Sequence, residues 1–358
     1  MIRVLQIFHN MGNGGVEAFV MNNYRKIDRE KIQFDFLTSV DEPGYFDEEI
    51  KALGGRIFRA YPLKKNPFRN YHDIARIVRE NDYQIVHRHT GSAFGYFDLR
   101  AAKKGGAKCL ILHSHNPAAG KSWVHRVSKR LLEIDCTRLA CSDAAGLFLF
   151  GNKEFTVMPN AIDCDKYQFS AEARNLVRTE WQAKDAFVIG HIGRLEEQKN
   201  HKRLVEIFSA VLKKNEKSIL VCVGDGSLRQ SVEAFAKQLG VFDKIRFLGT
   251  RNDVGKLING FDVFCFPSNY EGFGITLIEA QANGLHCYTS KAVVPGEANL
   301  AGNVHFIPLT ASDEEWADLI LKAPTERDLS AIDRIKDAGY SIDQQSNKLI
   351  DFYEQCIS

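Results

Sequence analysis

The chain lacks the marks of a disulfide-stabilised, zinc-binding or membrane-spanning protein. Its eight cysteines include no CxxC pair, and several stand inside apolar runs, as Cys222 and Cys265 do, so we expect buried thiols. No stretch reaches the roughly 18 uninterrupted apolar residues that a membrane-spanning helix needs. The opening run MIRVLQIFHN is shorter than a signal peptide and is typical of a strand. We therefore expect a cytoplasmic protein whose contact with the inner face of the cell membrane is at most peripheral.

The net charge is small, at +2, but it is unevenly distributed. Residues 51–153 hold 19 Lys and Arg against 7 Asp and Glu, a balance of +12, whereas residues 166–358 hold 23 against 26. A basic region favours anionic partners such as phosphates, nucleic acid or an anionic membrane, and a solvated basic face is the structural alternative. No RRM, KH or helix-turn-helix signature is evident and few aromatic residues interleave with the basic ones, so we expect no nucleic-acid partner.

Length and pattern predict two α/β domains. At 358 residues the chain exceeds the roughly 250–300 residues at which one hydrophobic core stops growing. Short apolar runs alternate with amphipathic segments, which is typical of βαβ units and parallel sheets. The predicted strands are residues 3–8, 33–37, 85–87, 109–113, 138–141, 156–158, 187–192, 218–223, 244–247, 263–266 and 287–289. The predicted helices are residues 16–27, 71–80, 123–132, 201–213, 227–239, 275–282 and 341–354.

The strand–helix pattern restarts after a polar stretch, residues 163–184, which we interpret as a linker. The predicted fold class is α/β, with two Rossmann-like, doubly wound parallel-sheet domains. We place the first domain at residues 1–165, the second at residues 166–340, and a C-terminal helix that packs back toward the first domain at residues 341–358.

A glycine cluster follows the first strand of the first predicted domain, and a pair of cations follows the first strand of the second. Gly12-Asn13-Gly14-Gly15 opens the first helix, where backbone N–H groups can approach an anion, although a tight turn is the alternative and the spacing is not GxGxxG.

The cations lie in residues 191–200, HIGRLEEQKN. Arg194 and Lys199 are expected at the carboxyl edge of the second sheet, where ligands bind in open α/β sheets. Two cations beside a helix start suit a diphosphate, and solvated loop charges are the alternative.

The third segment, residues 271–279, reads EGFGITLIE and follows the strand predicted at residues 263–266. Gly272 and Gly274 open the backbone ahead of a helix, so free N–H groups can meet an anion or sugar hydroxyls. Glu271 precedes this helix and Glu279 lies a little over one turn inside it. Carboxylates accept hydrogen bonds from vicinal diols, so both are candidates for sugar hydroxyls, and an exposed helix glutamate is the alternative for Glu279.

Two further signals lie in the first domain. The sequence HSHNP at residues 113–117 ends a strand, where a histidine can face an interdomain cleft or be merely structural. The sequence WVHRVSKRLL at residues 123–132 predicts an amphipathic helix that suits anionic lipid, or else a helix packed on the sheet with a solvated basic face. Its apolar side comprises Trp123, Val124, Val127 and Leu131, and its basic flank comprises Arg126, Lys129 and Arg130.

The ordered set GRLEEQKN, VGDGSLRQSVEAFAKQLGV, FLGTRNDV and FPSNYEGFGITLIEAQANG resembles glycosyltransferase family 4, the retaining enzymes of GT-B fold, and within it the bacterial exopolysaccharide and capsular polysaccharide glycosyltransferases. MPNAID at residues 158–163 resembles the strand and turn that close the family's first domain. The resemblance covers nearly the whole chain. It implies an acceptor-binding first domain and a donor-binding second domain that face each other across a cleft.

The resemblance also implies roles for single residues. Arg194 and Lys199 resemble the pair that holds the donor diphosphate, Glu271 the carboxylate that binds sugar hydroxyls, and His115 the histidine next to the reacting sugar. The donor-binding residues that it implies are Gly15 for the phosphate, Gly193, Arg251 by the base, Gly272, Phe273 and Gly274 by the sugar, Ile275 and Thr276 for phosphate, and Glu279 for the ribose.

These roles imply transfer of a hexose or N-acetylhexosamine from a nucleotide-diphosphate sugar with retention of anomeric configuration. The transition state is oxocarbenium-like, and the cations stabilise the charge that develops on the diphosphate. We identify no covalent nucleophile, and we do not identify the Asp-x-Asp pair that metal-dependent sugar transferases of the other major fold use. We therefore expect no metal and no cofactor beyond the nucleotide-sugar co-substrate.

Family frequency favours UDP as the nucleotide. Lys64, Lys65 and Arg69, with the helix at residues 123–132, suggest a lipid-linked glycan acceptor and contact with an anionic membrane. The alternatives are a nucleotide-sugar epimerase of similar fold, or a protein that binds nucleotide-sugar or nucleic acid without catalysis.

Overall fold

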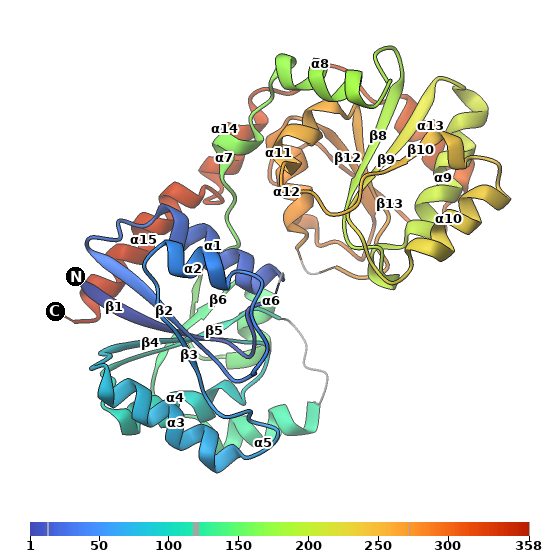
Figure 1. The fold of residues 1–358 in the computed structure, drawn as a ribbon. Helices are drawn as coiled ribbons and strands as arrows, with labels where there is room; N and C mark the ends of the chain where they lie inside the picture. Colours follow the sequence, from blue (N-terminus) through green and yellow to red (C-terminus); the bar gives the residue numbers. More distant parts are fainter. Residues whose placement is uncertain (13, 117–121, 272, 358) are drawn as a thin grey trace. The chain divides into compact units, whose positions relative to one another are not determined.

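The computed structural model describes residues 1–12, 14–116, 122–271 and 273–357, which form two compact units. Unit 1 comprises Met1–Ala161 and Ile342–Ser358, and unit 2 comprises Ile162–Ser341 (Figure 1). The predicted α/β class with two parallel sheets is confirmed. The division falls between Ala161 and Ile162, whereas the sequence placed it between residues 165 and 166. No helix among the described residues is long and apolar enough to cross a bilayer.

Unit 1 contains a parallel sheet with the strand order β3-β2-β1-β4-β5-β6-β7. Its strands are β1 (Ile2–Ile7), β2 (Ile32–Thr38), β3 (Ile57–Arg59), β4 (Ile85–Thr90), β5 (Cys109–Ser114), β6 (Thr137–Ala140) and β7 (Thr156–Val157). Its helices are α1 (Gly15–Lys26), α2 (Asp47–Ala52), α3 (Pro67–Glu80), α4 (Gly95–Gly105), α5 (Ser122–Leu132), α6 (Asp143–Phe150) and α15 (Ile342–Gln355).

Helices cover both faces of this sheet, which is why its strands read as nearly continuous apolar runs. Alternate strand residues such as Val4 and Ile111 pack with α1 and α15, while Leu5 and Leu112 pack with α3 and α4 on the other face. The C-terminal helix therefore completes the core of unit 1, where Tyr353 is 1% exposed.

Unit 2 contains a second parallel sheet with the strand order β10-β9-β8-β11-β12-β13. Its strands are β8 (Phe187–Ile192), β9 (Ser218–Val223), β10 (Ile245–Phe247), β11 (Val263–Phe266), β12 (His286–Ser290) and β13 (Val304–Ile307). Its α-helices are α7 (Cys164–Tyr167), α8 (Ala171–Glu180), α9 (His201–Lys214), α10 (Arg229–Gln238), α11 (Val254–Leu257), α12 (Ile275–Ala282), α13 (Asp313–Leu321) and α14 (Ala331–Asp337). Its 3-10 helices are η1 (Glu197–Lys199), η2 (Phe242–Lys244), η3 (Ile258–Gly260) and η4 (Gly296–Ala298).

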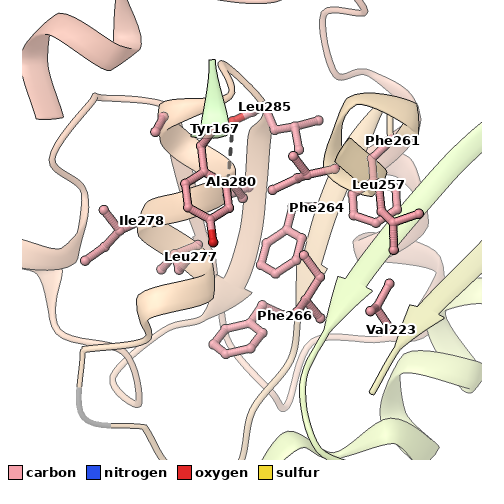
Figure 2. Close-up of a cluster of buried hydrophobic side chains, with 14 of the residues drawn as sticks. Tyr167, Val223, Leu257, Phe261, Phe264, Phe266, Leu277, Ile278, Ala280 and Leu285 are labelled. Atoms are coloured by element: carbon pink, nitrogen blue, oxygen red, sulfur yellow. Dashed lines mark hydrogen bonds between the residues drawn. The ribbon is translucent and has the colours of Figure 1, made fainter. Parts of the chain in front are cut away.

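One face of the second sheet packs against α12 and the segment that opens unit 2. Figure 2 shows Phe264 and Phe266 of β11 in one apolar cluster with Leu277 of α12 and with Tyr167. The opposite face packs against α9, α10 and α13, where Trp316 is fully buried.

The interpretation of residues 163–184 as an irregular linker is wrong, because α7 and α8 occupy most of this stretch. Ser170 caps α8 by accepting a hydrogen bond from the N–H of Ala173. Arg174 and Arg178 then pair with the buried Asp262. The stretch reads as polar because its arginines neutralise a buried carboxylate inside unit 2.

Candidate functional site

The predicted donor residues lie where the strand order of the second sheet reverses. Strand β8 pairs with β9 on one side and with β11 on the other. In open parallel sheets a ligand binds beside the carboxyl ends of such neighbouring strands. The loop after β8 carries Arg194 and Lys199, and the loop after β11 carries Glu271. The structure thus brings two separated sequence segments to one edge of unit 2.

Lys199 and Glu271 form an ion pair at this edge. Their side chains are only 15% and 10% exposed. The Lys199 ammonium also lies 4.6 Å from the centre of the Phe266 ring, and the Gln198 side chain donates a 3.4 Å hydrogen bond to Glu271. A cation and a carboxylate are therefore held side by side in a partly dehydrated setting, where their interactions are stronger than in water.

Arg194 differs from Lys199 because it is exposed. Its guanidinium makes no hydrogen bond or ion pair with another described residue, so five N–H donors remain for an anion. Gly193 precedes it and approaches Lys199 closely, since a Cβ at Gly193 would lie 3.1 Å from the Lys199 Cγ. A glycine at this position leaves room for the lysine stem.

The start of α12 presents unpaired backbone donors. Gly274 adopts φ +77°, a left-handed conformation that glycine tolerates, and the helix begins at the next residue. Within the described residues, the N–H groups of Ile275 and Thr276 have no backbone acceptor. Phe273 stacks on Tyr340 with ring centres 5.5 Å apart. Gly272 lies outside the described residues.

Glu279 lies on α12 and is half-buried. The Tyr167 hydroxyl donates a 2.6 Å hydrogen bond to its Oε1, and Figure 2 shows Tyr167 beside Leu277 and Ala280 of the same helix. Burial raises the pKa of Glu279 to about 7, although the Tyr167 hydrogen bond and the nearby Lys166 lower it. The carboxylate therefore titrates near neutral pH, and the alternative of an ordinary exposed helix glutamate does not describe it.

Carboxylates of the protein already bind Arg251 and the helix start that holds Gly15. Arg251 makes two hydrogen bonds of 2.8 and 2.7 Å to Asp253, which raise its pKa. In unit 1, Gly15 begins α1, and backbone hydrogen bonds from Gly14 and Glu17 hold the Glu17 carboxylate at that helix start. Burial nevertheless raises the pKa of Glu17. An anion at this helix start therefore has to replace a side chain of the protein.

His115 follows β5 in unit 1 and is 8% exposed. Its ring belongs to a cluster with His87, His89 and His113. Burial lowers the pKa of all four side chains, to about 3 for His87 and His115. Ring nitrogens of His87, His89 and His113 lie within 4.8 Å of one another, so this triplet has the donor atoms that a metal ion would require.

The expectation that the sequence lacks an Asp-x-Asp pair is wrong, because Asp163-Cys164-Asp165 is one. This pair stands at the start of the short helix α7 rather than after a strand of the second sheet. Asp163 is the N-cap residue of α7 and is half-buried, whereas Asp165 is exposed. The pair is therefore not part of the edge that carries Arg194.

Helix α5 exposes the middle and end of its predicted apolar side. Val127 and Leu131 are 48% and 65% exposed, and the preceding residue in each case, Arg126 and Arg130, is also exposed. The Trp123 and Val124 side chains lie outside the described part of the structure. A basic, partly apolar surface is thus present on α5.

The sequence alone does not identify several residues at these sites. The sequence gives no role to Phe266, Gln198 or Tyr167. Only their contacts with Lys199, Glu271 and Glu279 identify them. A usable signal existed for the histidine cluster. His87 and His89, like His113 and His115, are two residues apart, which places each pair on one face of a strand.

The chain has two doubly wound sheets, and cations, carboxylates and an open helix start lie at the edge of the second. This arrangement is that of the GT-B class of glycosyltransferases. Comparison with known proteins agrees. The family model described as Glycosyltransferase Family 4 matches residues 13–166, and the model described as Glycosyl transferases group 1 matches residues 174–340.

The chain belongs to glycosyltransferase family 4. It is 34% identical over 370 residues to EpsF of Bacillus subtilis (strain 168), named as a glycosyltransferase, with 98% of this chain and 96% of that protein covered. It is 26% identical over 298 residues to the Escherichia coli UDP-Gal:alpha-D-GlcNAc-diphosphoundecaprenol alpha-1,3-galactosyltransferase, with 77% and 76% covered. The predicted enzyme class is thereby confirmed, and the epimerase and non-catalytic alternatives are not favoured.

A solved structure shares the whole fold. HepE of Anabaena in complex with UDP matches with a TM-score of 0.80 at 18% identity, and the match covers 99% of this chain and 100% of that one. At this identity the likeness supports the fold alone.

Proposed function

We propose that this glycosyltransferase transfers a hexose or N-acetylhexosamine from a UDP-sugar, with retention, to a hydroxyl of a lipid-linked glycan in polysaccharide biosynthesis. The observation that carries the donor half is the Lys199–Glu271 pair beside the exposed Arg194 at the reversal of the second sheet. A nucleotide-sugar presents a diphosphate and sugar hydroxyls to such an edge, and these are the groups that two cations and a carboxylate bind.

In the proposed reaction the bond between the anomeric carbon and the diphosphate oxygen breaks, and the acceptor oxygen bonds to the same face of that carbon. The acceptor proton passes to the departing diphosphate. Arg194, Lys199 and the N–H groups of Ile275 and Thr276 stabilise the charge that develops on the leaving group. This arrangement supplies the diphosphate with protein donors, so we propose that no metal ion is required.

Donor binding changes the partners of Lys199 and Glu271. Lys199 turns from the carboxylate to the diphosphate, which releases Glu271 to accept hydrogen bonds from sugar hydroxyls. Glu279 accepts hydrogen bonds from the ribose when it is ionised. Arg251, held by Asp253, stands in the loop proposed to line the base pocket.

The proposal for the acceptor is supported by the relative that acts on a diphosphoundecaprenol-linked sugar and by the surface of α5. Arg126 and Arg130 suit anionic headgroups, while Val127 and Leu131 suit the acyl boundary. Lys64, Lys65 and Arg69 add positive charge to unit 1. We propose that the enzyme meets its acceptor at the cytoplasmic face of the membrane.

A donor panel tests the proposal. Thermal unfolding is measured with UDP and with UDP-, GDP- and ADP-sugars, for the wild type, Lys199→Ala and Glu271→Ala. A ligand at about 100 times its Kd adds about 2.7 kcal/mol, which for a unit of this size raises Tm by about 5–10 °C. We expect this shift with UDP-sugars in the wild type, a smaller shift in Lys199→Ala, and in Glu271→Ala no gain from a UDP-sugar over UDP. A shift with GDP- or ADP-sugars instead would overturn the choice of nucleotide.

Product analysis then separates transfer from epimerisation. The enzyme is incubated with the preferred donor, with and without a sugar linked through diphosphate to a polyprenol. We expect a glycosylated lipid with retained configuration in the first case and unchanged donor in the second. Epimerised donor in the absence of acceptor would contradict the proposal.

A further inference from the structure

Four of the buried histidines of unit 1, at positions 87, 89, 113 and 115, belong to a series of hydrogen-bonded side chains across the central strands of the first sheet. These side chains lie on one face of β1, β4 and β5, and they include Tyr353 of α15, the helix that covers this face. The members of the series in order of contact are His115, His89, Gln6, Tyr353, His87 and His113. The register pairs Gln6 with His87 and His89 with His113, so neighbouring strands hold the members in line.

One half of the series determines which nitrogen of His115 carries a proton. The Gln6 amide oxygen lies 2.8 Å from His89 Nε2, and an amide oxygen only accepts. Neutral His89 therefore carries its proton on Nε2 and accepts at Nδ1. Its Nδ1 lies 2.9 Å from His115 Nε2, which must donate. His115 is thus protonated on Nε2, and its Nδ1 is a bare acceptor.

In the other half the hydrogen bonds are donated in the same direction, from Gln6 toward His113. The Gln6 amide nitrogen donates to the Tyr353 hydroxyl over 3.1 Å, and that hydroxyl lies 2.7 Å from His87 Nδ1. Tyr353 then donates to His87, which donates from Nε2 to His113 Nδ1 over 3.2 Å. His113 Nε2, at this end of the series, is buried and has no hydrogen-bond partner among the described residues. These hydrogen bonds require His89, His87 and His113 to be neutral, because each of them accepts at one ring nitrogen. His115 is neutral because burial lowers its pKa to about 3.

His115 Nδ1 is buried and has no hydrogen-bond partner among the described residues. Buried polar atoms without a partner are few in native proteins, and each calls for an explanation. His115 follows the carboxyl end of β5, one strand from the reversal of the first sheet between β1 and β4. A ligand bound at that edge supplies the missing donor when it brings a hydroxyl group to this nitrogen.

We propose that His89 is a positioning residue, which with Gln6 holds His115 as the tautomer protonated on Nε2 and thereby keeps Nδ1 free to accept a hydrogen bond from a hydroxyl of the reacting sugar. The part that concerns the sugar rests on the proposed function. The part that concerns the tautomer does not, since it follows from contacts within unit 1.

The tautomer is read directly from the protein without any sugar. Histidine labelled with 15N in both ring positions gives long-range 1H–15N correlations that distinguish protonated from bare nitrogens, and His115→Gln assigns the signals. At pH 7 we expect His115 to carry its proton on Nε2. A proton on Nδ1 of His115 would mean that the hydrogen bond with His89 is donated in the opposite direction, and it would overturn the proposal.

Three variants separate positioning from packing. His89→Phe removes the acceptor and keeps an aromatic ring beside Phe8, whose ring stacks on His89 at 4.8 Å. His89→Asn restores an acceptor near the Nδ1 position. His87→Phe is the matched control, because it removes an equally buried histidine beyond Gln6 and leaves the His115–His89–Gln6 segment intact. All three are compared by thermal unfolding and by the same spectra.

We expect His89→Phe alone to give His115 a mixture of tautomers, and to lower kcat by about tenfold or more with an unchanged KM for the donor. His89→Asn should recover the tautomer and part of kcat. His87→Phe should leave the His115 tautomer unchanged and kcat within about twofold of the wild type. An unaltered His115 tautomer in folded His89→Phe overturns the proposal. So does one equivalent of tightly bound Zn²⁺ that shifts the His87, His89 and His113 signals together. Absence of transferase activity in every form, with the tautomers as expected, counts against the proposed function and leaves the assignment standing.

Discussion

Lys199 and Glu271 pair with each other although 72 residues separate them in the chain. The cation proposed for the diphosphate and the carboxylate proposed for the sugar thus neutralise one another at the edge of the second sheet. Two consequences of this pairing, one for UDP and one for turnover, can be measured separately.

Binding of UDP alone should respond in opposite directions to loss of the two partners. Glu271→Ala frees Lys199 for the diphosphate, so calorimetry should show tighter binding of UDP by a factor of a few. Lys199→Ala removes the cation and should weaken it. The control is Lys202→Ala, an exposed lysine on α9. Weaker UDP binding by Glu271→Ala would show that Glu271 does not compete with the diphosphate for Lys199.

Turnover should fall in Lys199→Ala because the leaving group loses a preorganised charge. Removal of one such group typically costs about 10²–10³ in kcat. We expect a loss of this size in steady-state assays with saturating donor, and less than about a twofold change for Lys202→Ala. A change confined to the KM of the donor would mean that Lys199 binds the ground state and the transition state equally.

Glu279 should make both stability and nucleotide affinity depend on pH. Its pKa is about 7 in the folded chain and 4.5 in a model peptide, so the folded state retains a proton that the unfolded state loses between these values. Stability is therefore greatest below about pH 4.5 with respect to this group and falls as pH rises to about 7, by no more than about 3 kcal/mol. Denaturant unfolding of wild type and Glu279→Gln between pH 5 and pH 8 measures the difference.

The same carboxylate should bind ribose better once ionised, so UDP affinity should rise through about pH 7 in the wild type. Glu279→Gln should lose that rise, and Tyr167→Phe should move it to higher pH because the tyrosine hydrogen bond lowers the Glu279 pKa. An identical pH profile in wild type and Glu279→Gln would exclude Glu279 from nucleotide binding.

Asp262 should contribute far more to stability than a surface carboxylate. It is 8% exposed, pairs with Arg174 and Arg178, and accepts a 2.7 Å hydrogen bond from the Val188 N–H. Asp262→Asn leaves two arginines uncompensated and should lower the free energy of unfolding by about 3 kcal/mol. Asp318→Asn, which breaks an exposed pair with Lys214, should cost less than about 1 kcal/mol. Tryptophan fluorescence follows the transition, and equal losses would refute the structural role of Asp262.

Helix α5 should bind anionic vesicles through its exposed side. Each arginine near an anionic surface contributes about 1 kcal/mol, so Arg126→Glu with Arg130→Glu should abolish binding in a flotation assay. Leu131→Asp should weaken it, whereas Leu176→Asp, on a similarly exposed leucine of unit 2, should not. Binding that is equal on zwitterionic vesicles would contradict the electrostatic part of the proposal.

The long apolar runs made the strands of both sheets predictable, because a strand buried on both faces leaves a continuous signal in the sequence. The helix predicted at residues 275–282 has the bounds of α12. The short strands β3 and β13 were missed, since Ile57–Arg59 and Val304–Ile307 mix apolar with polar residues at the sheet edges. Helix α8 was not predicted, because Arg174 and Arg178 make its sequence look solvent-exposed although they pair with the buried Asp262.

By itself the sequence determined the α/β class, the family and the short list of cations, carboxylates and glycines, because these depend on residue type and local spacing. The tertiary structure decided which of them act on one another. Only folding places Lys199 against Glu271, Tyr167 against Glu279 and His89 between Gln6 and His115, since each contact joins segments that the sheet brings together across long separations in the chain. The protonation of Glu279 and of His115 depends on burial and on those partners, and neither can be read from a linear motif.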